Sequence, residues 1–283
     1  MAQIPASGRI PVSDRIPVSN RVATSGRLRQ WIPNKDPFFW VQPQFSSSVG
    51  PGVIINKTDN LAGIGRGTTS LTGYTSAYYP TYGTTGSHGH ADFNGVFNNM
   101  NFSGTNDLAA ALSAKTNLCF FFVGTWDVLV ALKNTVFGVN VGSGGGGNYL
   151  LIHSGVLSGS AVLFGMRDSV SGKWGETDSG LITAGQRFLL TCWFNGAGAE
   201  NADRMKVRIN GVERALTFTG TIPPTSLTCP ASTTSIFIGT TALIIGREWD
   251  GKQEFFQGYN VAIDYTTEVP AMEAALNNYY SIY

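Results

Sequence analysis

Met205-Lys-Val-Arg-Ile-Asn-Gly-Val-Glu-Arg214 is the stretch that decides the fold class of this chain. Apolar and charged residues alternate on both sides of Asn210-Gly211, and a period of two is typical of a strand with one buried face. Asn-Gly is favoured in two-residue hairpin turns because both positions need a positive φ. The stretch therefore predicts a β-hairpin.

Further strand-sized segments lie on both sides of this hairpin. Leu118–Val123 is a continuous apolar run, which predicts a strand buried on both faces. We expect the other strands at Ala91–Phe97, Tyr149–His153, Ala161–Met166, Phe188–Phe194, Ser235–Gly239, Ala242–Gly246 and Phe255–Tyr265. Pro270–Ser281 alone has helical spacing, with Pro270 suited to the first helical position. These segments predict an all-β jelly-roll β-sandwich with a short C-terminal helix.

The composition supports this fold class. The chain has 283 residues, a net charge of +1, 13% charged residues, 35 glycines and 17 phenylalanines, which favours strands joined by many turns. No stretch approaches the about 20 apolar residues that a membrane-spanning helix needs. The three cysteines, Cys119, Cys192 and Cys229, are expected to be free thiols of a protein assembled in a reducing cytoplasm.

The N-terminus carries a hexapeptide repeated four times, in Ile4–Arg9, Ile10–Arg15, Ile16–Arg21 and the weaker Val22–Arg27. The proline in each of the first three copies excludes a helix. In an extended conformation every copy presents the same side chains in the same direction. We therefore expect residues 1–30 to form an extended arm that anchors the protein to a partner. Its predicted contacts are Ile4, Arg9, Ile10, Arg15, Ile16, Arg21 and Arg27.

Two other interpretations of the arm are a secretion signal and a disordered tail. A secretion signal is excluded because an arginine interrupts the apolar residues at every sixth position. A disordered tail stays open, although such tails are usually poor in Ile and Val. The arginines are spaced among aliphatic residues, which argues against nucleic acid as the partner and favours a protein groove with acidic spots.

Residues 31–70 are expected to be an irregular connector rich in aromatic residues and proline, and residues 71–283 are expected to form the sandwich.

Several motifs in this order resemble one family. They are Phe93-Asn-Gly, Met100-Asn-Phe, Lys206–Val212, Phe256–Tyr265 and the helix that ends in Leu276-Asn-Asn-Tyr-Tyr. Together they resemble the laminin-G-like branch of the concanavalin A-like lectin/glucanase superfamily, as found in tailed-bacteriophage virion proteins. The resemblance covers about residues 70–283. It implies a sandwich that binds glycans or proteins and in some members hydrolyses glycans. It also suggests a homo-oligomer, and specifically a trimer, because phage appendages are commonly trimeric.

The enzymatic branch of this family uses a Glu-x-Asp-x-Glu strand, whose carboxylates lie about 5 Å apart in retaining enzymes. This chain has only Glu176-Thr-Asp178-Ser-Gly180, which we expect to be a solvated loop. His88-Gly-His90 lacks further ligands at a motif spacing and is expected in an exposed loop. We therefore expect no catalytic residues, no metal and no cofactor.

Glycan binding needs an exposed aromatic face beside carboxylates and amides. The candidate glycan-binding residues are Trp174, next to Glu176 and Asp178, and Trp249, next to Asp250 and Lys252. A third candidate cluster is Tyr78, Tyr79 and Tyr82. Each of these aromatic residues could equally belong to the core or to an interface.

Two functional hypotheses follow. The favoured one is a structural virion protein of a tailed phage, which would be a capsid decoration, a head fibre or a tail appendage. The arm would anchor it to the capsid, portal or tail. We expect it to be exposed on the virion surface and assembled in the host cytoplasm. The alternative is an adhesin or receptor-binding protein that recognises host-surface glycan. A jelly-roll coat protein of a small virus is disfavoured because the arm has too few positive charges to neutralise much nucleic acid.

Overall fold

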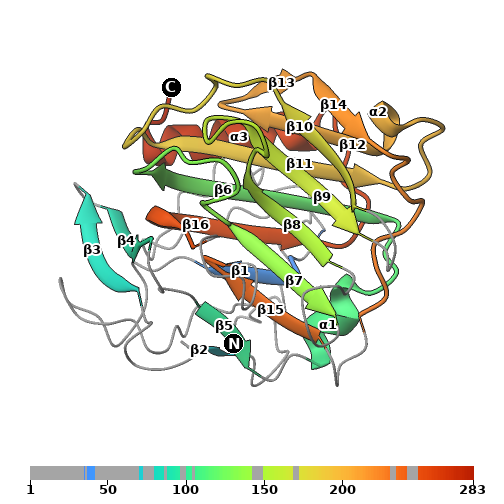
Figure 1. Ribbon diagram of the computed structural model, residues 1–283, viewed down its shortest axis with the longest axis horizontal. Helices are drawn as coiled ribbons and strands as arrows, with labels where there is room; N and C mark the ends of the chain where they lie inside the picture. Colours follow the sequence, from blue (N-terminus) through green and yellow to red (C-terminus); the bar gives the residue numbers. More distant parts are fainter. Residues whose placement is uncertain are drawn as a thin grey trace, which may run out of the picture.

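The computed structural model describes residues 35, 37–41, 70–72, 80–85, 88–95, 100–103, 106–141, 149–167, 172–229, 234–240 and 248–283. In this part of the chain, two antiparallel sheets face each other (Figure 1). The predicted β-sandwich is therefore confirmed. The arm, with Ile4, Arg9, Ile10, Arg15, Ile16, Arg21 and Arg27, lies outside the described residues, as does the strand expected at Ala242–Gly246.

Over the described residues, each sheet has eight strands. Sheet A has the order β13 (Val212–Arg214), β12 (Met205–Ile209), β11 (Phe188–Asn195), β6 (Asn117–Trp126), β16 (Asp250–Tyr259), β4 (His88–Asn94) and β3 (Thr81–Thr85), and β1 (Phe39–Val41) also pairs with β16. Sheet B has the order β14 (Leu216–Thr219), β10 (Gly172–Thr177), β9 (Val162–Arg167), β8 (Tyr149–Ser154), β7 (Phe137–Val141), β15 (Thr234–Ile238), β5 (Met100–Ser103) and β2 (Ser70–Thr72).

The hairpin predicted from the Asn-Gly pair joins β12 and β13. Asn210 has a φ of 51° and Gly211 a φ of 75°, which are the positive values that this turn requires. Val207 pairs with Arg214 and Ile209 with Val212 across the two strands. The alternation along β12 buries Met205, Val207 and Ile209 and leaves Lys206 and Arg208 partly exposed.

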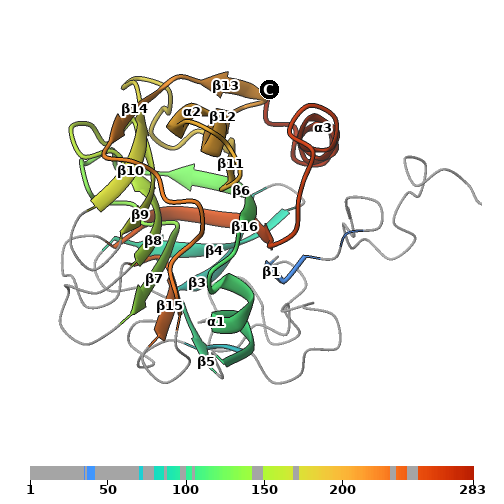
Figure 2. The ribbon, with the colours of Figure 1, turned by 90° about the vertical axis from the view of Figure 1, so that its right-hand side faces the viewer.

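Strand β6 is buried on both faces, as its apolar run predicts. Phe120 and Phe122 point into the core between the sheets, where they meet Phe137, Phe164 and Phe256. Cys119, Phe121 and Val123 point the other way, into a second apolar cluster. Helix α3 (Glu268–Tyr280) covers that cluster on the outer side of sheet A, with Val269, Met272, Leu276 and Tyr280 buried (Figure 2).

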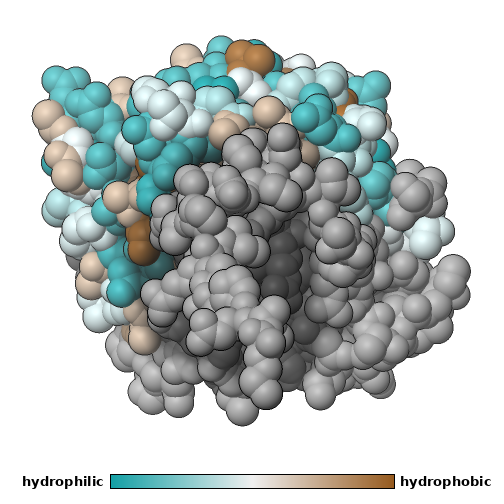
Figure 3. All heavy atoms as spheres, turned by 180° about the vertical axis from the view of Figure 1, so that it is seen from behind, coloured by the Kyte–Doolittle hydropathy of each residue, from teal (hydrophilic) through white to brown (hydrophobic). Residues whose placement is uncertain are grey.

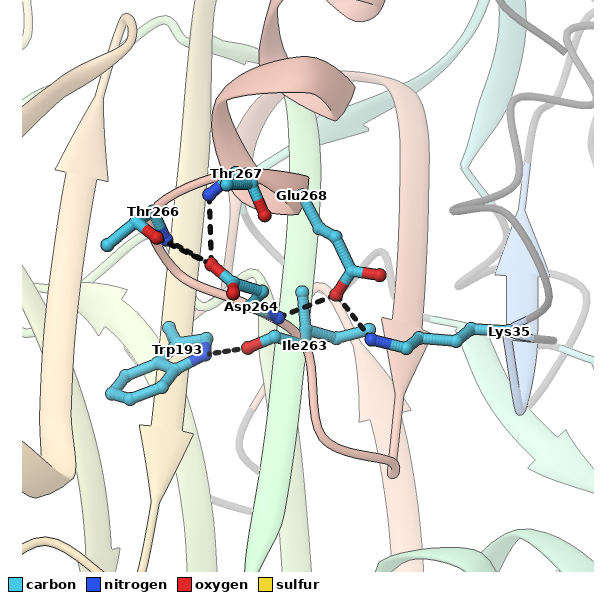
Figure 4. A network of polar contacts seen from close by, with 7 residues as sticks. All are labelled: Lys35, Trp193, Ile263, Asp264, Thr266, Thr267 and Glu268. Atoms are coloured by element: carbon cyan, nitrogen blue, oxygen red, sulfur yellow. Dashed lines mark hydrogen bonds and ion pairs between the residues drawn. The ribbon is translucent and has the colours of Figure 1, made fainter. Parts of the chain in front are cut away.

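The start of α3 was predicted two residues too late, because Pro270 is the third residue of the helix and not the first. A turn held by Asp264 precedes the helix (Figure 4). The Asp264 carboxylate accepts hydrogen bonds from Thr266 Oγ1 at 2.7 Å and from the N–H groups of Thr266 at 2.8 Å and Thr267 at 2.9 Å. Strand β16 also differs from the prediction: it begins at Asp250 and ends at Tyr259, so the segment up to Tyr265 belongs to the connection into α3.

Two shorter helices complete the described structure. α1 (Asn106–Leu112) buries Leu108, Ala109 and Leu112 in the core between the sheets, and α2 (Asn201–Arg204) is a single turn before β12. Part of the predicted connector also belongs to the sandwich. Phe39 in β1 is 1% exposed and packs against Phe137 and Phe256, with ring centroids 5.7 and 4.8 Å apart.

Viewed from the side opposite to Figure 1, the described surface is mostly hydrophilic, with a few separate hydrophobic residues (Figure 3). No helix among the described residues is long and apolar enough to cross a membrane.

Candidate functional site

The outer face of sheet B, near its β14 edge, brings together an aromatic ring, a carboxylate and two hydroxyl groups. Trp174 of β10 lies opposite Gly165 of β9 on one side and Thr219 of β14 on the other. Glu176, two residues along β10, lies opposite Leu163 and Thr217 in the same way. Opposed residues in antiparallel strands share a face, so these side chains form two adjacent rows.

The alternation along β10 explains which face these residues occupy. Gly175 lies opposite Phe164, a residue of the core between the sheets, so Trp174 and Glu176 on either side of it point outward. Leu216 and Phe218 of β14 pack over Gly175 from the inner side: a Cβ atom at Gly175 would lie 2.8 Å from Leu216 Cδ1 and 3.0 Å from Phe218 Cε1. The glycine therefore gives these two apolar side chains room on the inner face.

The site is open to solvent. Trp174 and Glu176 are partly exposed, and Thr217 and Thr219 are exposed. On the β9 side Trp174 lies opposite Gly165, where a Cβ atom would be 3.0 Å from Leu163 Cδ2 and 3.0 Å from Trp174 Cβ. Glu176 Oε1 accepts a hydrogen bond of 3.3 Å from the N–H of Leu157, whose side chain is 91% exposed at the β8–β9 turn. One carboxylate is thus held beside an aromatic ring and an exposed apolar side chain.

Trp249 does not form a second exposed aromatic site, and this prediction is wrong. Its side chain is 0% exposed, because it stacks on Phe93 with ring centroids 4.6 Å apart and its Nε1 donates a 3.0 Å hydrogen bond to the Thr125 carbonyl oxygen. Asp250, the first residue of β16, is partly exposed. Burial raises the pKa of Asp250, although Lys133 opposes the shift. Asp250 lies opposite Asn94 in sheet A, away from the Trp174 face.

Two other motifs also lie in strands and not in the loops expected for them. Glu176 belongs to β10, and the rest of the motif after the strand, Asp178, Ser179 and Gly180, is exposed. His88 and His90 belong to β4, where the ring of His88 lies 4.9 Å from the rings of both Tyr279 and Tyr280. Among the described residues, no group of three or more His, Cys, Asp or Glu side chains is placed to hold a metal ion. Tyr78 and Tyr79 lie outside the described residues.

A groove of about 410 Å³ lies between the β12–β13 hairpin and α3, lined by Arg208, Gly211, Val212, Ala274 and Tyr283 among others. Its charged groups bind each other. The Glu273 carboxylate, 2% exposed, accepts hydrogen bonds from Arg208 Nε at 2.9 and 3.0 Å and from Thr191 Oγ1 at 2.7 Å. Burial raises the pKa of Glu273, and Thr191 and Arg208 oppose that shift. The network attaches α3 to sheet A, so we assign it a structural role.

Sequence reasoning identified Trp174 and Glu176 but missed Thr217 and Thr219. The signal for them was present in Leu216-Thr-Phe-Thr219, which alternates with a period of two. The sequence could not show that this strand pairs with β10.

The comparisons concern the fold. No protein-family model matches the chain, and no curated protein sequence matches it. Among solved structures, the CBM40 domain of the Ruminococcus gnavus IT-sialidase, bound to α2,3-sialyllactose, matches with a TM-score of 0.50 and 9% identity over 65% of this chain and 95% of that one.

Two further matches have lower TM-scores. Domain 4 of AbnA, an arabinanase from Geobacillus stearothermophilus solved with arabinotriose, gives a TM-score of 0.49 and 16% identity over 85% of this chain and 98% of that one. A pentraxin from Limulus polyphemus gives a TM-score of 0.43 and 16% identity over 64% of this chain and 78% of that one. The chain shares the β-sandwich fold of the R. gnavus domain.

Proposed function

We propose that this protein binds carbohydrate on the outer face of sheet B, at Trp174 and Glu176 of β10 and Thr217 and Thr219 of β14. The observation that carries the proposal is the partly exposed ring of Trp174 in one row with Thr219, beside a second row with Glu176 and Thr217. The C–H faces of a sugar stack on an aromatic ring, and its hydroxyls exchange hydrogen bonds with carboxylates and hydroxyl groups. The four residues supply both kinds of contact.

The fold supports the same proposal in a general way. The R. gnavus domain of this architecture was solved with a bound sialyl sugar, so a β-sandwich of this kind can hold a glycan. We propose binding without hydrolysis, because Glu176 lacks the second glutamate of the Glu-x-Asp-x-Glu strand. Incubation of the full chain with the glycan it retains should therefore release no sugar.

A glycan array or affinity electrophoresis tests the site. Trp174→Ala should weaken binding at least about tenfold, because a central aromatic contact typically dominates recognition. Glu176→Gln should weaken it less, because it removes charge but keeps a hydrogen-bonding group. Tyr283→Ala is the matched control, since Tyr283 is 56% exposed and lies beside α3. If the glycan retains the unaltered protein and the three variants equally, any sugar site lies elsewhere.

A second candidate function rests on the hexapeptide repeats. We propose that residues 1–30 anchor the protein to a larger assembly, such as the capsid, portal or tail of a virion, and that the sandwich is displayed on its surface. The entry of the chain into the sandwich fits this arrangement. Lys35 forms an ion pair with Glu268 in the first turn of α3, on the side of sheet A opposite to sheet B (Figures 2 and 4). An anchor on that side leaves the Trp174 face pointing outward.

The anchor makes a testable prediction. Deleting residues 2–27 should leave the sandwich folded but remove the protein from particles, because repeated contacts on one chain share a single entropic cost of association. Replacing the four repeat arginines by glutamine should weaken attachment more at low salt than at high salt, whereas Ile10→Ser with Ile16→Ser should weaken it at any salt concentration. Undiminished incorporation of the deleted protein would reject the anchor.

A further inference from the structure

Strand β14 is a free edge of sheet B: among the described residues it pairs with β10 alone. Edge strands are usually protected from pairing with other chains by charged residues, prolines or bulges. β13, at the corresponding end of sheet A, follows this rule with Glu213 and Arg214. Leu216-Thr-Phe-Thr219 has no charge and no proline, and consists mostly of residues with high β-propensity. The edge is therefore suited to a strand partner.

The side chains of this edge match those of a second, antiparallel copy. Two antiparallel strands related by a two-fold axis through Phe218 place Phe218 opposite itself and Thr217 opposite the partner's Thr219. Aromatic pairs and threonine pairs are both favourable across antiparallel strands. Phe218 and Leu216 are only partly buried against the core, so a second copy would complete their burial. The edge is self-complementary on its inner and outer faces.

We propose that two copies of this chain associate through β14, in the register with Phe218 on the two-fold axis, to form one continuous sheet. The partner would extend the site described above. Trp174 lies opposite Thr219, and Thr217 lies opposite Glu176, so the row on the outer face runs from Trp174 through Thr219 to the partner's Thr217 and the partner's Glu176. With strands about 4.8 Å apart, this row spans about 14 Å.

This extended row rests on the proposed carbohydrate function, whereas the dimer does not. A glycan longer than one sugar would contact the aromatic ring of one subunit and the carboxylate of the other. The strand overlap is short, so we expect a weak dimer that becomes more populated at high protein concentration or on a multivalent glycan surface.

Disulfide trapping tests the register. The three native cysteines are buried, and burial raises the pKa of each thiol, so introduced cysteines are the reactive ones. Thr217 and Thr219 are exposed, so neither substitution disturbs the core. A mixture of Thr217→Cys and Thr219→Cys chains should form a covalent dimer under mild oxidation, because directly opposed Cβ atoms lie about 4.5–5.5 Å apart. Each variant alone should form much less, because its cysteines are about 7–8 Å apart on the diagonal.

Sedimentation velocity on the full chain provides the second measurement. The unaltered protein should shift from monomer towards dimer as its concentration rises, and Thr217→Lys with Thr219→Lys should raise the dissociation constant about tenfold or more, because like charges then face each other. Val212→Lys on β13 is the matched control and should leave the dissociation constant unchanged. No selective mixed disulfide, or association that survives the lysine pair, would overturn the dimer. If Trp174→Ala loses glycan binding but the mixture of Thr217→Cys and Thr219→Cys chains forms no cross-link, the dimer is rejected and the proposed function is kept.

Discussion

Trp174 and Trp249 have similar sequence surroundings and opposite environments. Each tryptophan has an acidic residue and a lysine within three positions, yet Trp174 is partly exposed and Trp249 is fully buried. The difference comes from their strands. Trp174 lies on the outward face of β10, whereas Trp249 just precedes β16 and packs between Phe93 and Phe122. Local composition alone could not separate a ligand contact from a core residue.

The stability of the two alanine variants should reflect this difference. Trp249→Ala should lower the free energy of unfolding by about 3–5 kcal/mol, because it leaves a cavity in the core. Trp174→Ala should lower it by less than about 1 kcal/mol, since the site is close to the surface. Urea denaturation measures both values. Similar losses for the two variants would contradict the assignment of Trp174 to binding and Trp249 to structure.

His90 gives a prediction about pH. Burial lowers its pKa to about 4, and Lys252 and Arg187 add to the shift. In the unfolded chain the histidine binds a proton below about pH 6.5, so between that pH and about 4 the unfolded state binds more protons than the native state. Stability should therefore fall as the pH is lowered through this window. In His90→Gln that loss should be smaller; an unchanged slope of unfolding free energy against pH would contradict the account.

At the scale of elements, the parts that could be predicted are those whose own residues determine them. Asn210-Gly211 requires a tight turn whatever surrounds it, and the apolar run of β6 has to be buried on both faces. β10 was missed because its glycines and charged residues gave no strand pattern, and β14 because its partner lies far away in the sequence. The start of α3 was placed too late because the Asp264 turn was not recognised. Non-local pairing is decided by tertiary context, whereas the Asp264 turn is formed by hydrogen bonds to Thr266 and Thr267 and is local in the sequence.

The attachment of α3 to sheet A can be tested with two glutamates. Glu273→Ala should lower the free energy of unfolding by about 3–5 kcal/mol, because it leaves the Arg208 guanidinium largely buried without its carboxylate. Glu213 forms a 3.1 Å ion pair with Lys206 but is 47% exposed, so Glu213→Ala should cost less than about 1 kcal/mol. Thermal or urea unfolding measures both. A loss in Glu273→Ala no larger than that in Glu213→Ala would show that the buried network does not hold the helix.

At the scale of the whole molecule, the sandwich has two distinct sides. α3 lies outside sheet A (Figure 2), and Lys35 forms an ion pair with Glu268 in its first turn. Trp174 lies on the outer face of sheet B. The second apolar cluster under α3 covers the outer face of β6, β11 and β16 in sheet A, whereas sheet B has exposed side chains on its outer face near the β14 edge. The proposed attachment through the arm and the proposed glycan binding at Trp174 are therefore compatible in one chain.

Hydrogen–deuterium exchange of the full chain, with and without the glycan that it retains most strongly, tests the carbohydrate site most directly. We predict that the glycan slows exchange in residues 172–177 and 216–219, which carry Trp174, Glu176, Thr217 and Thr219, and leaves α3 unchanged. Protection confined to the groove between α3 and the β12–β13 hairpin, or no protection in β10 and β14 at saturating glycan, would contradict the assignment of the site.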